Sequence, residues 1–164
     1  MAFDLPADLN PELAPLAWLL GTWTGGGHGE YPNIDRFRFM QEVVFNHDKR
    51  DFLSYYSRTW IVNDDDTVGA PLSAETGFWK INNGVLEVVL TNSNGQSQGW
   101  VGRAEGPRIQ LVLDHSYTSP NGTGLVSEGN RLYGLVEGEL FWAYDMASDG
   151  HEMQPHMWAT LKRA

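Results

Sequence analysis

The chain has 164 residues, and we expect a single domain over residues 1–164. Its 11 Lys and Arg against 21 Asp and Glu give a formal charge of −10, which repels phosphate backbones and anionic lipid surfaces. We therefore expect neither nucleic acid nor membrane as a partner. The chain has no cysteine, which excludes disulfides, thiolate metal sites and thiol nucleophiles. No apolar run is long enough to span a membrane, and the N-terminus lacks the charged and apolar regions of a signal peptide, so we expect a cytoplasmic protein.

The N-terminal region predicts one short helix. Asn10 is a good N-cap, and Pro11 suits the first helical position. Leucines and alanines then follow from Glu12 to Leu20, where Gly21 ends the helix. One face is apolar enough to plug or cover another element.

The remainder of the chain predicts strands separated by turn signals every 8–12 residues or so, the spacing of an all-β sandwich or barrel. The expected strands cover residues 21–25, 37–45, 52–62, 73–81, 85–90, 98–104, 109–115, 124–133, 139–146 and 153–162. Short turns such as Asn82-Asn83-Gly84 favour antiparallel hairpins. We expect an all-β, up-and-down antiparallel β-barrel of about ten strands with a short N-terminal helix. A barrel of that size encloses a cavity for a ligand.

Histidine is the main candidate for metal chemistry in a chain without cysteine. Three of the five histidines fall in turns or at a strand end, where an exposed side chain is the ordinary interpretation: His47, His115 and His151. His28 falls in a glycine-rich segment that we interpret as a loop, where it could line the mouth of a pocket. No two histidines are spaced i, i+2 or i, i+4, so the sequence has no local signature of a protein-built metal cluster.

His156 differs because it falls inside the last expected strand. Alternation groups it with Trp158 and Thr160 on one face of that strand. Both faces are partly apolar, so the pattern does not say which one points inward. A histidine there could coordinate a metal or contact a packed cofactor, or it could be structural.

Three parts of the chain resemble the nitrobindin family. The segment from Gly21 to Gly27 matches its Gly-x-Trp-x-Gly-x-Gly motif through Gly21, Trp23, Gly25 and Gly27. Further landmarks occur in the right order at Glu42-Val43-Val44-Phe45, Pro71-Leu72 and Glu75-Thr76-Gly77. The segment His156-Met157-Trp158-Ala159-Thr160-Leu161-Lys162 is similar to the family's last strand, whose histidine is the proximal haem ligand.

This resemblance implies a ten-stranded barrel that holds one haem b near its open end. His156 would be the axial ligand of the haem iron, opposite an open position, and Asn33 would lie beside the haem where many members have Thr. Ser73 stands where several members have a distal His, so a distal His role does not carry over. The resemblance also implies isomerisation of peroxynitrite to nitrate on ferric haem and binding of nitric oxide. Two alternatives stay open: a non-catalytic sensor of nitric oxide or peroxynitrite, and a lipocalin-like carrier of an apolar ligand.

Overall fold

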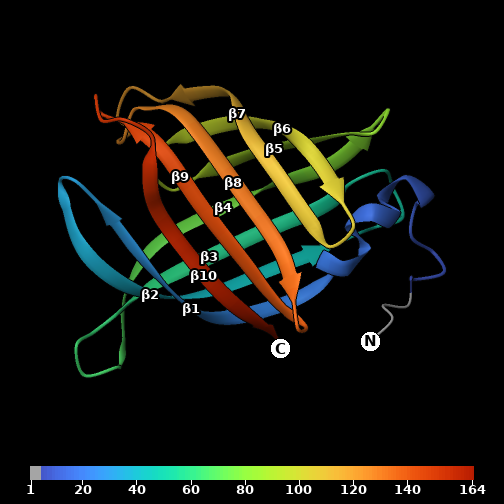
Figure 1. Ribbon diagram of the computed structural model, residues 1–164, viewed down its shortest axis with the longest axis horizontal. Helices are drawn as coiled ribbons and strands as arrows, with labels where there is room; N and C mark the ends of the chain where they lie inside the picture. The colour runs from blue at the N-terminus through green and yellow to red at the C-terminus, as the bar shows by residue number, and fades with distance from the viewer. Residues whose placement is uncertain (1–4) are drawn as a thin grey trace.

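Ten antiparallel strands close into one barrel, as the sequence predicts (Figure 1). The computed structural model describes residues 5–164. The strands are β1 (Gly21–Tyr31), β2 (Ile34–Asn46), β3 (Leu53–Val62), β4 (Val68–Asn82), β5 (Val85–Asn92), β6 (Gln96–Glu105), β7 (Arg108–Thr118), β8 (Val126–Val136), β9 (Glu139–Ser148) and β10 (Gln154–Arg163). Each strand pairs with its neighbours in the sequence, and β1 pairs with β10 to close the barrel. No helix among residues 5–164 is long and apolar enough to cross a membrane.

A 3₁₀ helix, η1 (Pro11–Leu19), plugs one end of the barrel. Asn10 caps it as predicted, because its side chain accepts a hydrogen bond from the backbone N–H of Glu12 at 3.0 Å. The side chains of Leu13, Leu16 and Leu19 are fully buried. The helix therefore covers the apolar interior at this end.

The first and last strands bind the end of η1 together. Trp23 on β1 is fully buried, and its indole N–H donates to the carbonyl oxygen of Leu19 at 2.8 Å. Arg163 on β10 donates to the carbonyl oxygens of Leu20 and Trp18, and its guanidinium lies 4.1 Å from the centre of the Trp23 ring. These contacts satisfy carbonyl groups that a helix end leaves free.

Strand β1 is longer than the sequence suggested. The expected strand ended at Gly25, whereas β1 continues through the glycine-rich segment to Tyr31, so His28 lies in a strand and not in a loop. The glycines are required here by packing. A Cβ at Gly27 would collide with the carbonyl oxygen of Trp158 and lie 2.6 Å from Cζ of Phe39. Missing side chains on β1 thus make room for the neighbouring strands and for an aromatic ring inside the barrel.

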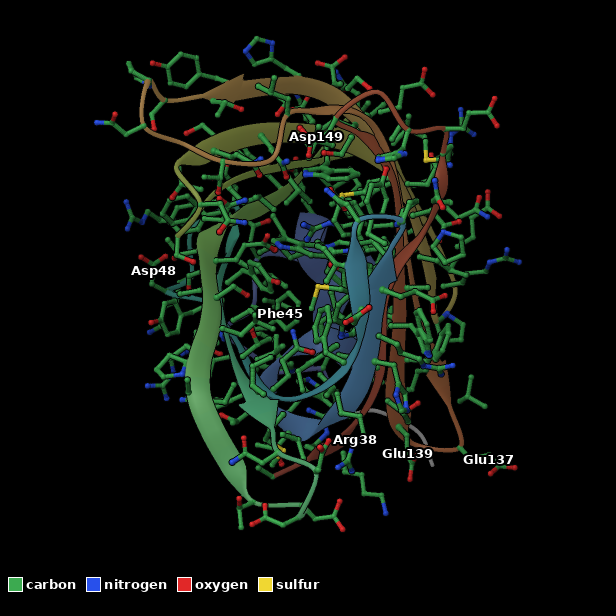
Figure 2. The ribbon with its side chains drawn as sticks, turned by 90° about the vertical axis from the view of Figure 1, so that its left-hand side faces the viewer. Arg38, Phe45, Asp48, Glu137, Glu139 and Asp149 are labelled. Atoms are coloured by element: carbon green, nitrogen blue, oxygen red, sulfur yellow. The ribbon has the colours of Figure 1, made fainter. Side chains whose placement is uncertain are left out.

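Aromatic side chains fill the half of the barrel next to η1. Trp79 is fully buried and contacts the rings of Phe45, Tyr55 and Tyr133 at centroid distances of 5.2, 5.8 and 5.1 Å. Figure 2 looks into the barrel from the opposite end and shows Phe45 inside it. The packed core thus occupies one half of the interior, and the other half is left for a cavity.

We expect Gly27→Ala to lower the free energy of unfolding by about 1–3 kcal/mol, because the added methyl group overpacks a site bounded by backbone. Gly26→Ala is the matched control. Gly26 faces outward, and the nearest atom to its added Cβ is the carbonyl oxygen of Phe39 at 3.5 Å. Its effect should stay within about 0.5 kcal/mol. Urea denaturation of both variants measures the difference, and equal stabilities would contradict this account of β1.

Candidate functional site

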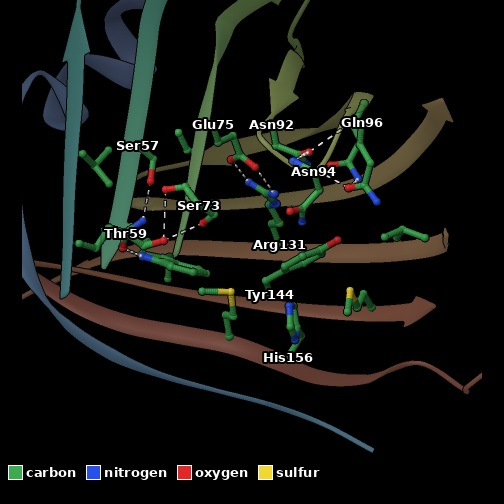
Figure 3. A pocket seen from close by; sticks show the side chains of 18 of the residues that line it. Ser57, Thr59, Ser73, Glu75, Asn92, Asn94, Gln96, Arg131, Tyr144 and His156 are labelled. Carbon is green, nitrogen blue, oxygen red and sulfur yellow. Dashed lines mark hydrogen bonds and ion pairs between the residues drawn. The ribbon is translucent and has the colours of Figure 1, made fainter. Parts of the chain in front are cut away.

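A cavity opens at the end of the barrel opposite η1 (Figure 3). It contains about 920 Å³ of space free of atoms, counting the part open to solvent. Uncharged polar side chains dominate the wall formed by β2 to β6: Gln41, Ser57, Thr59, Ser73, Asn92, Gln96 and Gln98. Larger and more apolar side chains from β8 to β10 form the wall across from them: Tyr133, Trp142, Tyr144, Met146, His156 and Met157.

A β-bulge turns His156 into this cavity. On β10, Pro155 pairs with Asp145 of β9 and Met157 pairs with Tyr144, so His156 is an extra residue without a partner on β9. Bulges of this kind commonly re-aim a side chain. Further along β10, Ala159 and Leu161 are buried. If alternation continued regularly from these two residues, His156 would point out of the barrel. The bulge reverses this and points it inward.

The neighbouring strand β1 is irregular at the same level. Its pairing with β2 shifts register between Gly29 and Tyr31. The carbonyl oxygen of Glu30, which lies between them, is 3.1 Å from Nδ1 of His156. Because a carbonyl oxygen only accepts, Nδ1 carries the proton and donates it. In the neutral ring, Nε2 then holds the lone pair that a metal ion can bind.

Burial favours the neutral form of the imidazole. The pKa of His156 is lowered from its ordinary value, first because burial disfavours the charged ring and also because Arg131 is nearby; the hydrogen bond to Glu30 opposes this. Tyr31 and Tyr144 contact the ring edge to face, at centroid distances of 5.6 and 5.8 Å. Tyr31 is itself fixed, since its hydroxyl accepts from the backbone N–H of Ser148 at 2.9 Å.

An ion pair lies at the bottom of the cavity. Both terminal nitrogens of Arg131 donate to the carboxylate of Glu75, at 2.6 and 2.9 Å. The hydroxyl of Tyr55 donates to the same carboxylate at 2.9 Å. Arg131 is 8% exposed, and its guanidinium lies 4.7 Å from the ring centres of both Trp100 and Tyr144. The only signals in the sequence were the Glu75 landmark and an arginine within an expected strand, and neither predicted this pair.

The polar wall is internally hydrogen-bonded. The hydroxyl of Ser73 lies 2.7 Å from that of Thr59. The side-chain amide of Gln41 donates to the hydroxyl of Ser57 at 2.9 Å and accepts from the indole N–H of Trp142 at 2.7 Å. This wall offers hydroxyl and amide groups to a ligand in the cavity.

The other predicted residues lie elsewhere. Asn33 is exposed in the turn between β1 and β2 and does not line the cavity, so its contact with haem stays a prediction. Gly21, Trp23, Gly25 and Gly27 pack β1 against η1, β2 and β10. His28 lies beside Trp158 with ring centres 6.0 Å apart and lines a shallower groove with Arg36 and Arg38.

The cavity offers few metal-binding side chains, which suits a metal ion that a cofactor already coordinates. Among residues 5–164, no group of three or more His, Cys, Asp or Glu side chains could hold a metal ion. The cavity instead presents one neutral histidine with a free Nε2 beside aromatic and aliphatic side chains. A single histidine ligand within a largely apolar wall is the arrangement that binds haem iron in many proteins. The residues present therefore fit haem.

Comparison with known proteins agrees with this geometry. Residues 12–163 match the model of the THAP4-like, heme-binding beta-barrel domain. The chain belongs to this family, that of the nitrobindins.

Two relatives align with this chain over nearly their full length. A protein of Nocardioides sp. named peroxynitrite isomerase is 43% identical, with 99% of each chain covered. A protein of Cutibacterium acnes named ferric nitrobindin-like protein is 40% identical over the whole of both chains. The crystal structure of Rv2717c from M. tuberculosis superposes with a TM-score of 0.85 at 35% identity, covering 95% of this chain and 99% of that one.

In the haem-free protein we expect His156 to titrate below pH 6.5, with the proton of the neutral ring on Nδ1. The unfolded chain takes up this proton near pH 6.5, whereas the folded chain resists it. The contribution of His156 to the free energy of unfolding should therefore fall as the pH drops from above 6.5 towards the lowered pKa. Nitrogen-15 NMR of the imidazole measures both the midpoint and the tautomer. A midpoint at or above 6.5 would contradict the buried environment described above.

Proposed function

We propose that this chain binds one haem b through Nε2 of His156, isomerises peroxynitrite to nitrate on the ferric form and binds nitric oxide. The observation that carries the proposal is the imidazole of His156, hydrogen-bonded through Nδ1 to the carbonyl oxygen of Glu30 and turned into the cavity by the bulge. When bound, ferric haem would supply a Lewis-acidic iron that can take up a small ligand. The name of the Nocardioides relative, peroxynitrite isomerase, supports the choice of reaction.

The protein's own part is to hold the ligand and shape the cavity. The carbonyl of Glu30 fixes the tautomer of His156, and the rings of Tyr31 and Tyr144 restrict its rotation. Across the cavity, the hydroxyl and amide groups of the polar wall can donate hydrogen bonds to a small anion. The formal charge of −10 gives no long-range attraction for an anion, so local hydrogen bonds must favour its binding.

The cavity is a poor container for an apolar chain. Its lining includes the ion pair between Arg131 and Glu75 and several side-chain amides. An alkyl chain has no polar atom for these groups and none for Nε2 of His156, whereas haem iron could bind that Nε2 and a small anion could accept the hydrogen bonds. This lining favours haem chemistry over the lipocalin-like carrier.

We expect His156→Ala to abolish the Soret band of the reconstituted ferric protein, because it removes the iron ligand. Haem affinity should fall by more than the roughly 10–100-fold that is typical when a residue supporting a metal ligand is replaced. His115→Ala is the matched control, since His115 is exposed on β7 and does not line the cavity. Spectrophotometric haem titration of the three proteins measures the effect.

Stopped-flow decay of peroxynitrite then tests the reaction. Ferric wild-type protein should accelerate decay with nitrate as the product, and His156→Ala should not. Failure of the wild-type chain to bind haem would end the proposal. Haem binding without faster decay would instead favour the non-catalytic sensor.

A further inference from the structure

The ion pair between Arg131 and Glu75 spans the interior of the barrel. Arg131 is on β8 and Glu75 is on β4, and three strands separate these two around the sheet. Figure 3 shows the two side chains meeting inside the barrel, with Tyr144 and His156 on the side of Arg131. The pair therefore ties opposite walls together directly below the cavity.

Arg131 is held by a carboxylate and by two aromatic rings. Glu75 binds both terminal nitrogens of its guanidinium, and this two-point geometry fixes the plane of the group. The rings of Trp100 and Tyr144 lie at the same distance from it, 4.7 Å to each centre. The two rings also contact each other edge to face, with centres 5.7 Å apart, so the guanidinium lies beside both rings and attracts both of them. The ion pair thus helps to fix the position of the Tyr144 ring.

Tyr144 is the link between this pair and His156. Strand register places Tyr144 opposite Arg131 on one side and opposite Met157, next to His156, on the other. Register brings the backbones together but leaves the rotation of the tyrosine ring open. The ring is in contact with Arg131 and meets the imidazole of His156 at an interplanar angle of 71°. Arg131 and Trp100 together therefore hold its orientation.

We propose that Arg131, anchored by Glu75, is a positioning residue for His156 and acts through the ring of Tyr144. Without Arg131 the tyrosine ring gains freedom to rotate, and the imidazole loses one of the two rings that restrict it. The hydrogen bond from Nδ1 to Glu30 is then made for a smaller fraction of the time. This inference rests on the proposed function only in taking haem iron as what His156 binds.

The test compares Arg131→Met with wild-type protein in two states. In the haem-free state, nitrogen-15 shifts of His156 should move from a single Nδ1–H tautomer towards a mixture of tautomers. In the reconstituted state, haem affinity should fall by about 10–100-fold, as is typical when a group behind a metal ligand is removed. The stretching frequency of the iron–histidine bond in the ferrous protein, measured by resonance Raman, should shift as well.

Two further variants keep the test decisive. Arg131→Met with Glu75→Gln removes both charges, so no unpaired carboxylate remains to destabilise the fold, and it should show the same changes at His156. Adding Arg131→Met to Tyr144→Leu should lower haem affinity no further than Tyr144→Leu alone, because both act through one ring.

The matched control is Arg58→Met on the outside of the barrel. Arg58 also pairs with a glutamate, Glu42 at 2.6 Å, and also lies over an aromatic ring, Trp60 at 5.3 Å. It should leave haem affinity and the His156 shifts unchanged. Unchanged shifts and affinity in a folded Arg131→Met protein, or additive losses with Tyr144→Leu, would overturn the proposal. If wild-type protein binds no haem, the proposed function fails, and the haem-free shifts still decide the role of Arg131.

Discussion

The pairing of β1 with β10 is the contact on which the rest of the molecule depends. It closes the barrel, and its two ends serve different purposes. At the plugged end, Arg163 of β10 and Trp23 of β1 hold η1 in place. At the open end, His156 of β10 donates to Glu30 of β1. The glycines of β1 make such close pairing possible, since a side chain at Gly27 would collide with β10. The same pair of strands thus stabilises the fold and positions the candidate iron ligand.

The interior is divided into two halves with different chemistry. Aromatic rings around Trp79 fill the half next to η1, and polar side chains line the cavity in the other half. Arg131 and Glu75 lie at the boundary, where Tyr55 belongs to both halves by packing on Trp79 and donating to Glu75. A buried ion pair adds little stability compared with well-packed apolar residues, because removing two charges from water is costly. The pair matters for another reason: Arg131 contacts the ring of Tyr144, and that ring contacts His156.

Most of the fold could be predicted from the sequence, because turn residues and alternation are local signals. The helix with its Asn10 cap and the ten strands are confirmed. The length of β1 was predicted wrongly, since a run of glycines ordinarily signals a turn and here relieves crowding. Less of the candidate site could be predicted from the sequence. His156 could be named, but its direction depends on a bulge that alternation does not reveal. The partnership of Arg131 with Glu75 joins residues 56 apart in sequence across the barrel, and no local pattern encodes such a contact.

The location of His156 on β10 also has a consequence for biosynthesis. Its hydrogen-bond acceptor, Glu30, lies 126 residues earlier in the chain. During translation β1 emerges first and β10 last of the ten strands, so the edge of β1 that faces β10 has no partner until β10 has been synthesised. Closure of the barrel and formation of the hydrogen bond between His156 and Glu30 therefore occur together. The candidate site thus becomes complete only after the last strand has joined the barrel.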